Sequence, residues 1–165
     1  MKARMRNVVE VFPGSLKALQ ELNASVEKGG VSPKTLELVH LRASQINGCS
    51  VCVGLHGSAL KRMGETDDLL FAVAAWRDAP FFTDPERAAL ALTEAVTRLG
   101  DRSDPVPDEV WDEAAKHYCE EALAQLLGHI AGINVWNRLN VTTRQPSWAG
   151  GLLQPENTEK AATRN

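Results

Sequence analysis

The 165-residue sequence lacks any block of Lys or Arg, and 18 basic residues nearly balance 21 acidic ones, for a formal net charge of -3. A protein that follows a phosphate backbone needs a basic stripe, so we expect no nucleic-acid partner. No apolar run approaches the roughly 20 residues of a membrane span, and no apolar signal core follows the basic residues at 1–6. We therefore expect a cytoplasmic protein with no membrane partner.

The sequence also lacks the period-two alternation of apolar and polar residues that half-buried strands require. Apolar residues recur instead at spacings of three and four, which is typical of amphipathic helices. A chain of this length with 44% hydrophobic residues can bury one core but not two. The sequence predicts an all-α fold with a single domain over 1–145. A loosely ordered tail is expected over 146–165, where Gly, Pro and polar residues dominate.

Helix boundaries are marked by local signals. Ser32 followed by Pro33 predicts a helix start, because serine caps free N–H groups and proline fits the first helical position. This helix is expected to end at Asn47-Gly48, and the next to run from about residue 49 to Gly64. Further helices are expected around residues 17–22, 67–76, 84–100, 110–118 and 120–139.

The predicted helix over 120–139 is the most apolar segment of the chain. Its large apolar residues are Leu123, Leu126, Leu127, Ile130, Ile133 and Trp136. They occupy more than one helix face, which implies burial on several sides or an oligomer interface. We expect an obligate homo-oligomer, because a small two-layer domain does not easily cover so wide an apolar surface.

Three cysteines are present, so they cannot all pair within one chain. Cys49 and Cys52 form a CxxC pair, which in a reducing compartment is more often catalytic or metal-binding than a structural disulfide. On one helix Cys49, Cys52 and His56 stand at i, i+3 and i+7 and share a face. This pattern is typical of a redox centre. A thiolate reacts, a second thiol closes a disulfide on it, and an imidazole moves the proton. Cys119 is left without a predicted role.

Glu37 stands twelve residues before Cys49. Along one unbroken helix the two would lie about 18 Å apart. If the chain reverses at Asn47-Gly48 into a helical hairpin, Glu37 and His56 fall at similar heights and can meet. Cys49 would then begin its helix, where free N–H groups and the positive dipole end favour a thiolate, and we expect it near the surface.

A different interpretation treats Glu37, Cys49, Cys52 and His56 as four zinc ligands. Structural zinc sites more often use a second Cys or His pair at ligand spacing, which this sequence lacks. We therefore expect no metal and no cofactor.

Two other histidines are interpreted as structural. His40 lies one turn after Glu37 and would flank the site. His129 would satisfy a partner within the packed apolar helix.

The segment ELVHLRASQINGCSVC over 37–52, followed by His56, resembles the core of the alkylhydroperoxidase D (AhpD-like) branch of the carboxymuconolactone decarboxylase family. The segment INVWNRLN over 133–140 resembles that family's closing helix, so the resemblance spans about residues 15–142. It implies a multi-helix fold with a central helical hairpin carrying the CxxC site, assembled as a trimer or hexamer. The sequence departs from the best-known members at Val51, where they carry a second histidine, so no relay can run through that position.

The resemblance implies an antioxidant thiol peroxidase, a peroxiredoxin-type oxidoreductase that reduces organic hydroperoxides. Cys52 would attack the peroxide, Cys49 would resolve the product as a disulfide, and His56 and Glu37 would relay protons. A thioredoxin-like or dihydrolipoyl protein fits as the external dithiol reductant. Two alternatives stay open. One is a carboxymuconolactone decarboxylase-like enzyme acting on a lactone acid, in which the cysteines would be dispensable, and the other is a redox-sensing oligomeric scaffold.

Overall fold

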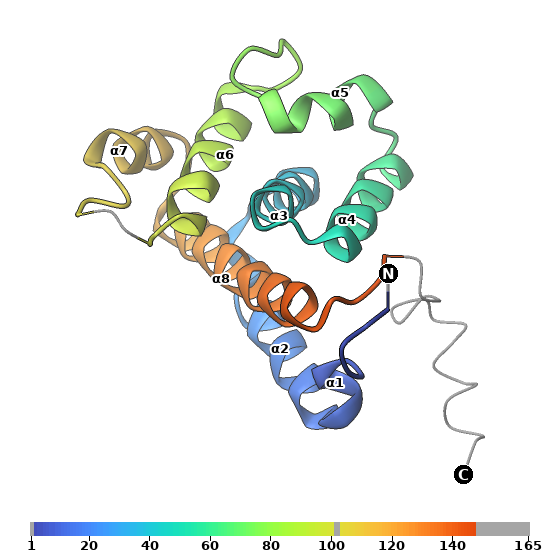
Figure 1. Cartoon of the computed structure of the whole chain (residues 1–165). Coiled ribbons are helices and arrows are strands. Elements are labelled where there is room, and N and C mark those ends of the chain that lie inside the picture. Colours follow the sequence, from blue (N-terminus) through green and yellow to red (C-terminus); the bar gives the residue numbers. More distant parts are fainter. Residues whose placement is uncertain (1, 101–102, 148–165) are drawn as a thin grey trace.

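Two helices, α3 (Pro33–Asn47) and α8 (Glu120–Thr143), form the centre of the fold, and the other helices pack around them (Figure 1). The computed structural model describes residues 2–100 and 103–147, and in these residues all regular structure is helical, as predicted. The expected tail over 146–165 falls almost entirely outside the described residues, so the domain boundary stays a prediction. No helix in the described part of the chain is long and apolar enough to span a membrane.

The remaining helices follow the predicted order closely. They are α1 (Val8–Val11), α2 (Pro13–Ser25), η1 (Glu27–Gly29), α4 (Ser50–Arg62), α5 (Asp67–Ala72), η2 (Val73–Ala75), α6 (Asp84–Thr97) and α7 (Asp108–His117). Helix α1 was not expected. Helix α8 runs four residues beyond the predicted end at 139, and α6 ends at Thr97 rather than Gly100.

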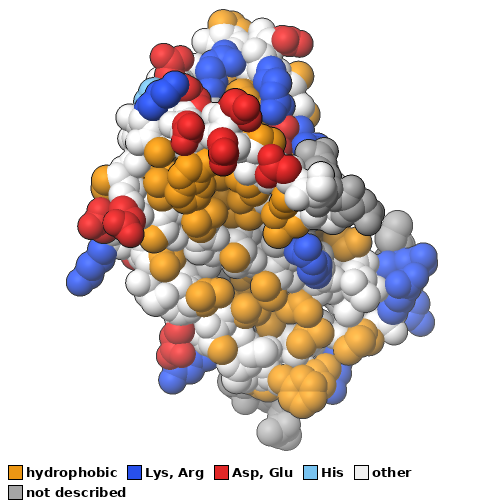
Figure 2. Space-filling model, turned by 90° about the vertical axis from the view of Figure 1, so that its left-hand side faces the viewer, with side chains coloured by type: hydrophobic (Ala, Val, Ile, Leu, Met, Phe, Trp, Pro, Cys, Tyr) orange, Lys and Arg blue, Asp and Glu red, His pale blue; other side chains and the backbone are white. Residues whose placement is uncertain are grey.

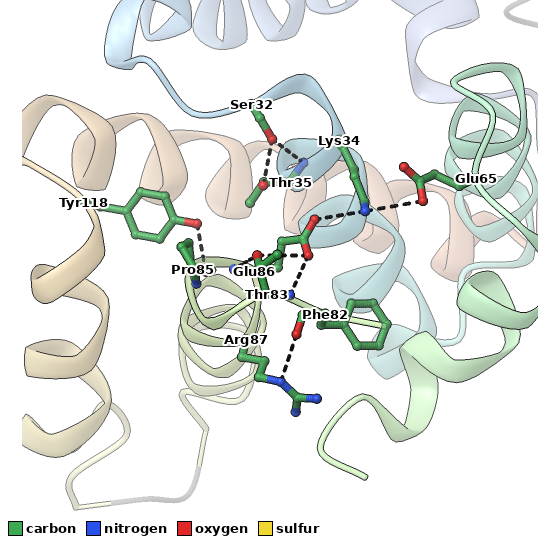
Figure 3. Close-up of polar contacts among 10 residues, drawn as sticks. All are labelled: Ser32, Lys34, Thr35, Glu65, Phe82, Thr83, Pro85, Glu86, Arg87 and Tyr118. Carbon is green, nitrogen blue, oxygen red and sulfur yellow. Dashed lines mark hydrogen bonds and ion pairs between the residues drawn. The ribbon is translucent and has the colours of Figure 1, made fainter. Parts of the chain in front are cut away.

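The N-termini of α3 and α6 carry side-chain caps. The Ser32 hydroxyl accepts the N–H of Thr35 at 3.1 Å, as the Ser-Pro signal indicated. At α6 the N-cap is Thr83, whose hydroxyl accepts the N–H of Glu86. The Glu86 carboxylate in turn accepts the Thr83 N–H at 2.8 Å (Figure 3). The two capped helix starts are also joined to each other, because Lys34 of α3 forms an ion pair with Glu86 of α6 at 3.2 Å (Figure 3). Capping therefore also joins the two helices.

Glu94 of α6 ties together three elements near the centre of the fold. It accepts hydrogen bonds from Arg42 Nε at 2.7 Å, Trp76 Nε1 at 3.0 Å and Arg77 Nη1 at 2.7 Å. Burial raises the pKa of this carboxyl, but the hydrogen bonds from Trp76, Arg77 and Arg42 outweigh burial and lower the pKa to about 2. The ionised carboxylate fixes α3 against α6 and the segment after α5.

Most of the large apolar side chains of α8 are covered by this same chain. Leu123, Leu126 and Ile130 belong to a core cluster with residues of α3, α6 and α7, and Ile133 packs beside the cysteines. This chain alone buries these four side chains, so the wide apolar surface of α8 is explained by burial on several sides without a partner chain. The oligomer stays a prediction.

One outer face of the molecule nevertheless carries exposed apolar side chains. Figure 2 shows hydrophobic side chains gathered beneath a cluster of acidic ones, on the side that lies to the left in Figure 1. An open groove of about 600 Å³ lies between α7 and α8, lined in part by Trp111, Leu123 and Leu127. Trp111 is 39% exposed.

Candidate active site

The chain reverses at Gly48, between α3 and α4. Gly48 lies in the left-handed region with φ 67°, which favours glycine, and the N–H of Cys49 donates to the Ser44 carbonyl at 2.9 Å. Helix α4 packs back along α3, so Glu37 near the start of α3 meets His56 in α4. His56 Nδ1 and Glu37 Oε2 lie 2.8 Å apart.

Cys49 and Cys52 face each other at the start of α4. Cys49 is the N-cap residue, and its Sγ accepts the N–H of Cys52 at 3.4 Å. The Cys49 thiol also donates to Cys52 Sγ, with the sulfurs 2.7 Å apart. The expectation that Cys49 lies near the surface is wrong, because Cys49 is 1% and Cys52 3% exposed. Ile133 of α8 belongs to the same buried cluster as the two cysteines, and Trp136 packs against this cluster.

The pKa values of the two thiols are shifted in opposite directions. Donation from Cys49 lowers the pKa of Cys52 to about 6, helped by Asn140, Asn137 and the charge of His56, although burial opposes the shift. The same hydrogen bond raises the pKa of Cys49, because its proton is held against the Cys52 sulfur, and burial adds to the effect. The helix start therefore does not make Cys49 the thiolate. Cys52 carries the charge.

Helix α8 supplies a row of asparagines to the site. Asn140 Nδ2 donates to Cys52 Sγ at 3.5 Å, and Asn140 Oδ1 accepts from Asn7 Nδ2 at 2.9 Å. Asn137 Nδ2 donates to Ser44 Oγ at 3.1 Å, on the last turn of α3. These amides hold the end of α3 and the Cys52 sulfur against α8.

Sequence reasoning included these asparagines in the segment over 133–140 but gave them no role. The signal was available, because amides at 134, 137 and 140 repeat every third residue in an otherwise apolar helix. Asn47 Nδ2 donates to the Oδ1 atoms of Asn134 and Asn137, each at 2.9 Å. The row therefore also fixes the turn between α3 and α4.

His40 and His129 extend the site into the core. The rings of His40 and His56 lie 4.6 Å apart between centroids, tilted by 48°. His40 Nε2 lies 3.1 Å from His129 Nδ1, and His129 Nε2 lies 3.8 Å from Glu27 Oε1. Burial, with the charges of His56 and His129, lowers the pKa of His40 well below its ordinary value, and burial also lowers that of His129. Both rings are therefore neutral at neutral pH.

The sequence placed His40 beside the site without a function, and it treated His129 as a packed residue with a local partner. Their link was not foreseen, because α3 and α8 are far apart in the chain. The possible metal ligands that lie close together are also not the four residues considered as zinc ligands from the sequence. In the described ranges, the cluster of three or more such side chains joins Glu37 and His56 with His40, and neither Cys49 nor Cys52 belongs to it.

Together the fold and the site define a class, an all-helical protein in which a buried dithiol lies beside a carboxylate–imidazole pair. The sequence profile of the carboxymuconolactone decarboxylase family matches residues 13–95, and the chain belongs to this family. The uncharacterized protein YdfG of Bacillus subtilis (strain 168) is 33% identical over 132 residues, which cover 80% of this chain and 88% of YdfG.

Solved structures share the fold. A protein of unknown function from Agrobacterium tumefaciens, described as a candidate antioxidant defence protein AhpD, superposes with a TM-score of 0.80 at 30% identity. The match covers 88% of this chain and 97% of that protein. The debrominase Bmp8 in complex with 2,3,4-tribromopyrrole has a TM-score of 0.73 at 21% identity, covering 86% and 74% of the two chains, and shows a shared fold alone. The AhpD-like all-α fold is therefore confirmed.

Proposed function

We propose that the protein is a thiol peroxidase, which reduces organic hydroperoxides by cycling Cys49 and Cys52 between dithiol and disulfide. The observation that carries the proposal is the asymmetry of the pair. Cys52 has its pKa lowered to about 6 and faces the protonated Cys49 thiol at 2.7 Å. A thiolate near neutral pH is the reactive form, and a protonated neighbour is ready to resolve its oxidised product.

In the first step the Cys52 thiolate attacks the terminal oxygen of the hydroperoxide and breaks the O–O bond. Cys52 becomes a sulfenic acid, and the alkoxide takes a proton and leaves as an alcohol. In the second step the Cys49 sulfur attacks the Cys52 sulfur, which releases water and forms the disulfide. The net reaction converts dithiol and hydroperoxide into disulfide, alcohol and water.

His56 supplies and removes protons in this scheme. Its Nδ1 is held by Glu37 Oε2 at 2.8 Å, and the charge of His56 lowers the pKa of Cys52. An imidazolium can give its proton to the departing alkoxide. The neutral ring can then accept the Cys49 proton as the disulfide closes and pass it to the departing hydroxide, which leaves as water. Glu37 orients the ring, so it is a positioning residue.

The disulfide must be reduced by an external dithiol, and a thioredoxin-like or dihydrolipoyl protein fits this role because either one presents two thiols. Assembly as a trimer or hexamer belongs to the same proposal. The groove between α7 and α8, lined in part by the exposed Trp111 and the half-buried Leu127, supports a contact between subunits. The 30% identical Agrobacterium protein, described as a candidate for antioxidant defence, supports the same assignment.

The proposal is tested by adding cumene hydroperoxide, tert-butyl hydroperoxide or hydrogen peroxide to the fully reduced protein. One equivalent of peroxide should disappear for each Cys49–Cys52 disulfide found by mass spectrometry, with repeated turnover when a dithiol reductant is supplied. Cys119, which is free and exposed, is the internal control for indiscriminate thiol oxidation.

Two other results would favour the alternatives. Loss of a lactone acid at equal rates with and without the cysteines would indicate the decarboxylase reaction. A disulfide that forms once and does not turn over would indicate a redox-sensing scaffold.

A further inference from the structure

We propose that Glu37, His40 and His56 form a binding site for a divalent transition-metal ion, foremost Zn²⁺. One ligand atom from each of these side chains lies within 4.8 Å of the others. The set offers two imidazole nitrogens and one carboxylate oxygen, which Zn²⁺ binds at about 2.0–2.2 Å. The inference goes beyond the proposed function and does not require peroxidase activity. It also departs from the sequence-based expectation of no metal, which did not include His40.

The three ligands come from two rigid elements. Glu37 and His40 stand one turn apart on α3, and His56 faces them from α4. Two ligands bound to a tetrahedral ion at about 2.1 Å lie about 3.4 Å apart, so donors that now lie within 4.8 Å of one another need to close in by at most about 1.4 Å. The side chains of His56 and Glu37 are 12% and 21% exposed, which leaves a path from solvent to the ion.

A second, independent observation is a buried nitrogen without a partner. His40 Nδ1 is buried and has no hydrogen bond within the described part of the chain. The Glu27 carboxylate, 3.8 Å from His129 Nε2, favours the proton on that nitrogen, so His129 Nδ1 is left as an acceptor. His40 Nε2, 3.1 Å away, then donates to it, and His40 Nδ1 keeps a free lone pair.

This arrangement matches the way proteins hold metal-binding histidines. One ring nitrogen bonds to a neighbour, which fixes the tautomer, and the other nitrogen is free for the ion. An unpaired buried lone pair is unfavourable, and a bound cation would satisfy it. The cation would also displace the proton that lies between Glu37 Oε2 and His56 Nδ1, and it would bind the electron pairs of both atoms. The metal-bound form would therefore have no free base beside Cys52.

The test must separate this site from the cysteines, because a CxxC pair also binds Zn²⁺. We would use tag-free protein carrying Cys49→Ser and Cys52→Ser, and titrate it with Zn²⁺ by calorimetry. One equivalent should bind. Replacing even an outer partner of a metal ligand weakens binding about 10–100-fold, so adding His40→Gln or Glu37→Gln should weaken it at least about tenfold.

His117→Gln is the matched control. His117 and Glu113 form another histidine–carboxylate pair, at 3.3 Å on the surface of α7, and removing it should leave zinc affinity unchanged. Zn²⁺ should also raise the melting temperature of the serine variant but not of the version with His40→Gln. A cooperative melting transition in each protein shows that both are folded. In the chain with its cysteines, Co²⁺ bound at this site should give visible d–d absorption without a strong sulfur charge-transfer band.

Failure of the metal site is distinguishable from failure of the proposed peroxidase, since the binding assay contains no peroxide and no reactive thiol. The proposal is overturned if the serine variant binds no zinc, or binds it equally well after His40→Gln. It is also overturned if Co²⁺ binding is accompanied by a sulfur charge-transfer band and disappears with the cysteines.

Discussion

Glu37 and His56 are nineteen residues apart in the chain, yet their side chains meet at 2.8 Å across the hairpin of α3 and α4. A single residue in the left-handed conformation, Gly48, makes this contact possible, because it lets α4 return along α3 immediately after α3 ends. The carboxylate fixes the imidazole that shares the site with Cys52. The reactivity of the thiol should therefore depend on a contact that lies about one helical turn from Cys52 along α4.

Substitution of His56 by alanine should slow oxidation of Cys52 by hydroperoxide mainly near neutral pH. Without the imidazole the thiolate loses an electrostatic partner and the alkoxide loses a proton donor, and the first deficit shrinks at high pH where the thiol ionises unaided. Single-turnover kinetics between pH 5 and 9 measure the effect, with His117→Ala as the control. An equal loss at every pH would assign His56 a structural role instead.

Alkylation of Cys52 by iodoacetamide should follow a pH curve with its midpoint near 6. The pKa of Cys52 is lowered to about 6 from 9.0, so the thiolate is populated above pH 6 in the folded protein but only near pH 9 in the unfolded one. Peptide mass spectrometry measures the alkylation rate of each cysteine. Because burial slows the alkylation of Cys52 at every pH, its rate at each pH is compared with its own rate at the other pH values.

Removing one hydrogen-bond donor to the Cys52 sulfur tests why the pKa of Cys52 is low. Asn140→Leu deletes the amide 3.5 Å from Cys52 Sγ, and a hydrogen bond to a charged group corresponds to about one to two pKa units. The midpoint should move upward by about that amount. An unchanged midpoint would mean that the Asn140 amide does not stabilise the charge of Cys52.

Glu94→Ala should lower the free energy of unfolding by about 3–5 kcal/mol, because it leaves Arg42 and Trp76 without their partly buried acceptor. The pKa of Glu94 is lowered to about 2, so its contribution is complete above its ordinary pKa of 4.5 and is lost as the pH falls toward 2. Urea unfolding at pH 7 and pH 3 measures both effects. The exposed Glu113 is the control, and Glu113→Ala should change little. Equal stabilities of the Glu94 and Glu113 variants at pH 7 would contradict the role given to Glu94.

Light scattering coupled to size exclusion at low micromolar concentration should find an oligomer several times heavier than the 18.0 kDa chain. Leu127→Glu, placed in the groove between α7 and α8, should shift the protein toward the monomer because a buried charge opposes association. Phe71→Glu changes an equally apolar residue on α5, 79% exposed and outside that groove, and should leave the mass unchanged. An active monomer of unsubstituted chain would refute the expected interface.

Local signals predicted the hairpin well. Ser32-Pro33 and Gly48 mark the two ends of α3, since capping and the left-handed turn depend only on neighbouring residues. The contact between Glu37 and His56 followed from counting residues on each side of that turn. The boundary of α6 was less clear, because Asp84 and Thr83 both satisfy the sequence rule for an N-cap.

The rest of the site depends on α8, and the sequence did not reveal how that helix docks. Asn140 is 88 residues from Cys52, and His129 is 89 residues from His40. No local rule places such residues together. The same docking buries Cys49, which the adjacent turn suggested would be exposed. The pKa of Cys49 is raised rather than lowered, first because its thiol donates to Cys52 and then because it is buried.

The most direct test of the account is to find which sulfur a hydroperoxide oxidises first. Reduced Cys49→Ser and Cys52→Ser proteins would each receive one equivalent of cumene hydroperoxide with dimedone present, followed by peptide mass spectrometry. The account predicts a sulfenic acid adduct on Cys52 in Cys49→Ser, with one equivalent of peroxide consumed, and no peroxide consumption by Cys52→Ser beyond that of Cys119. An adduct on Cys49 in Cys52→Ser, with Cys52 unreactive in the other variant, would contradict it.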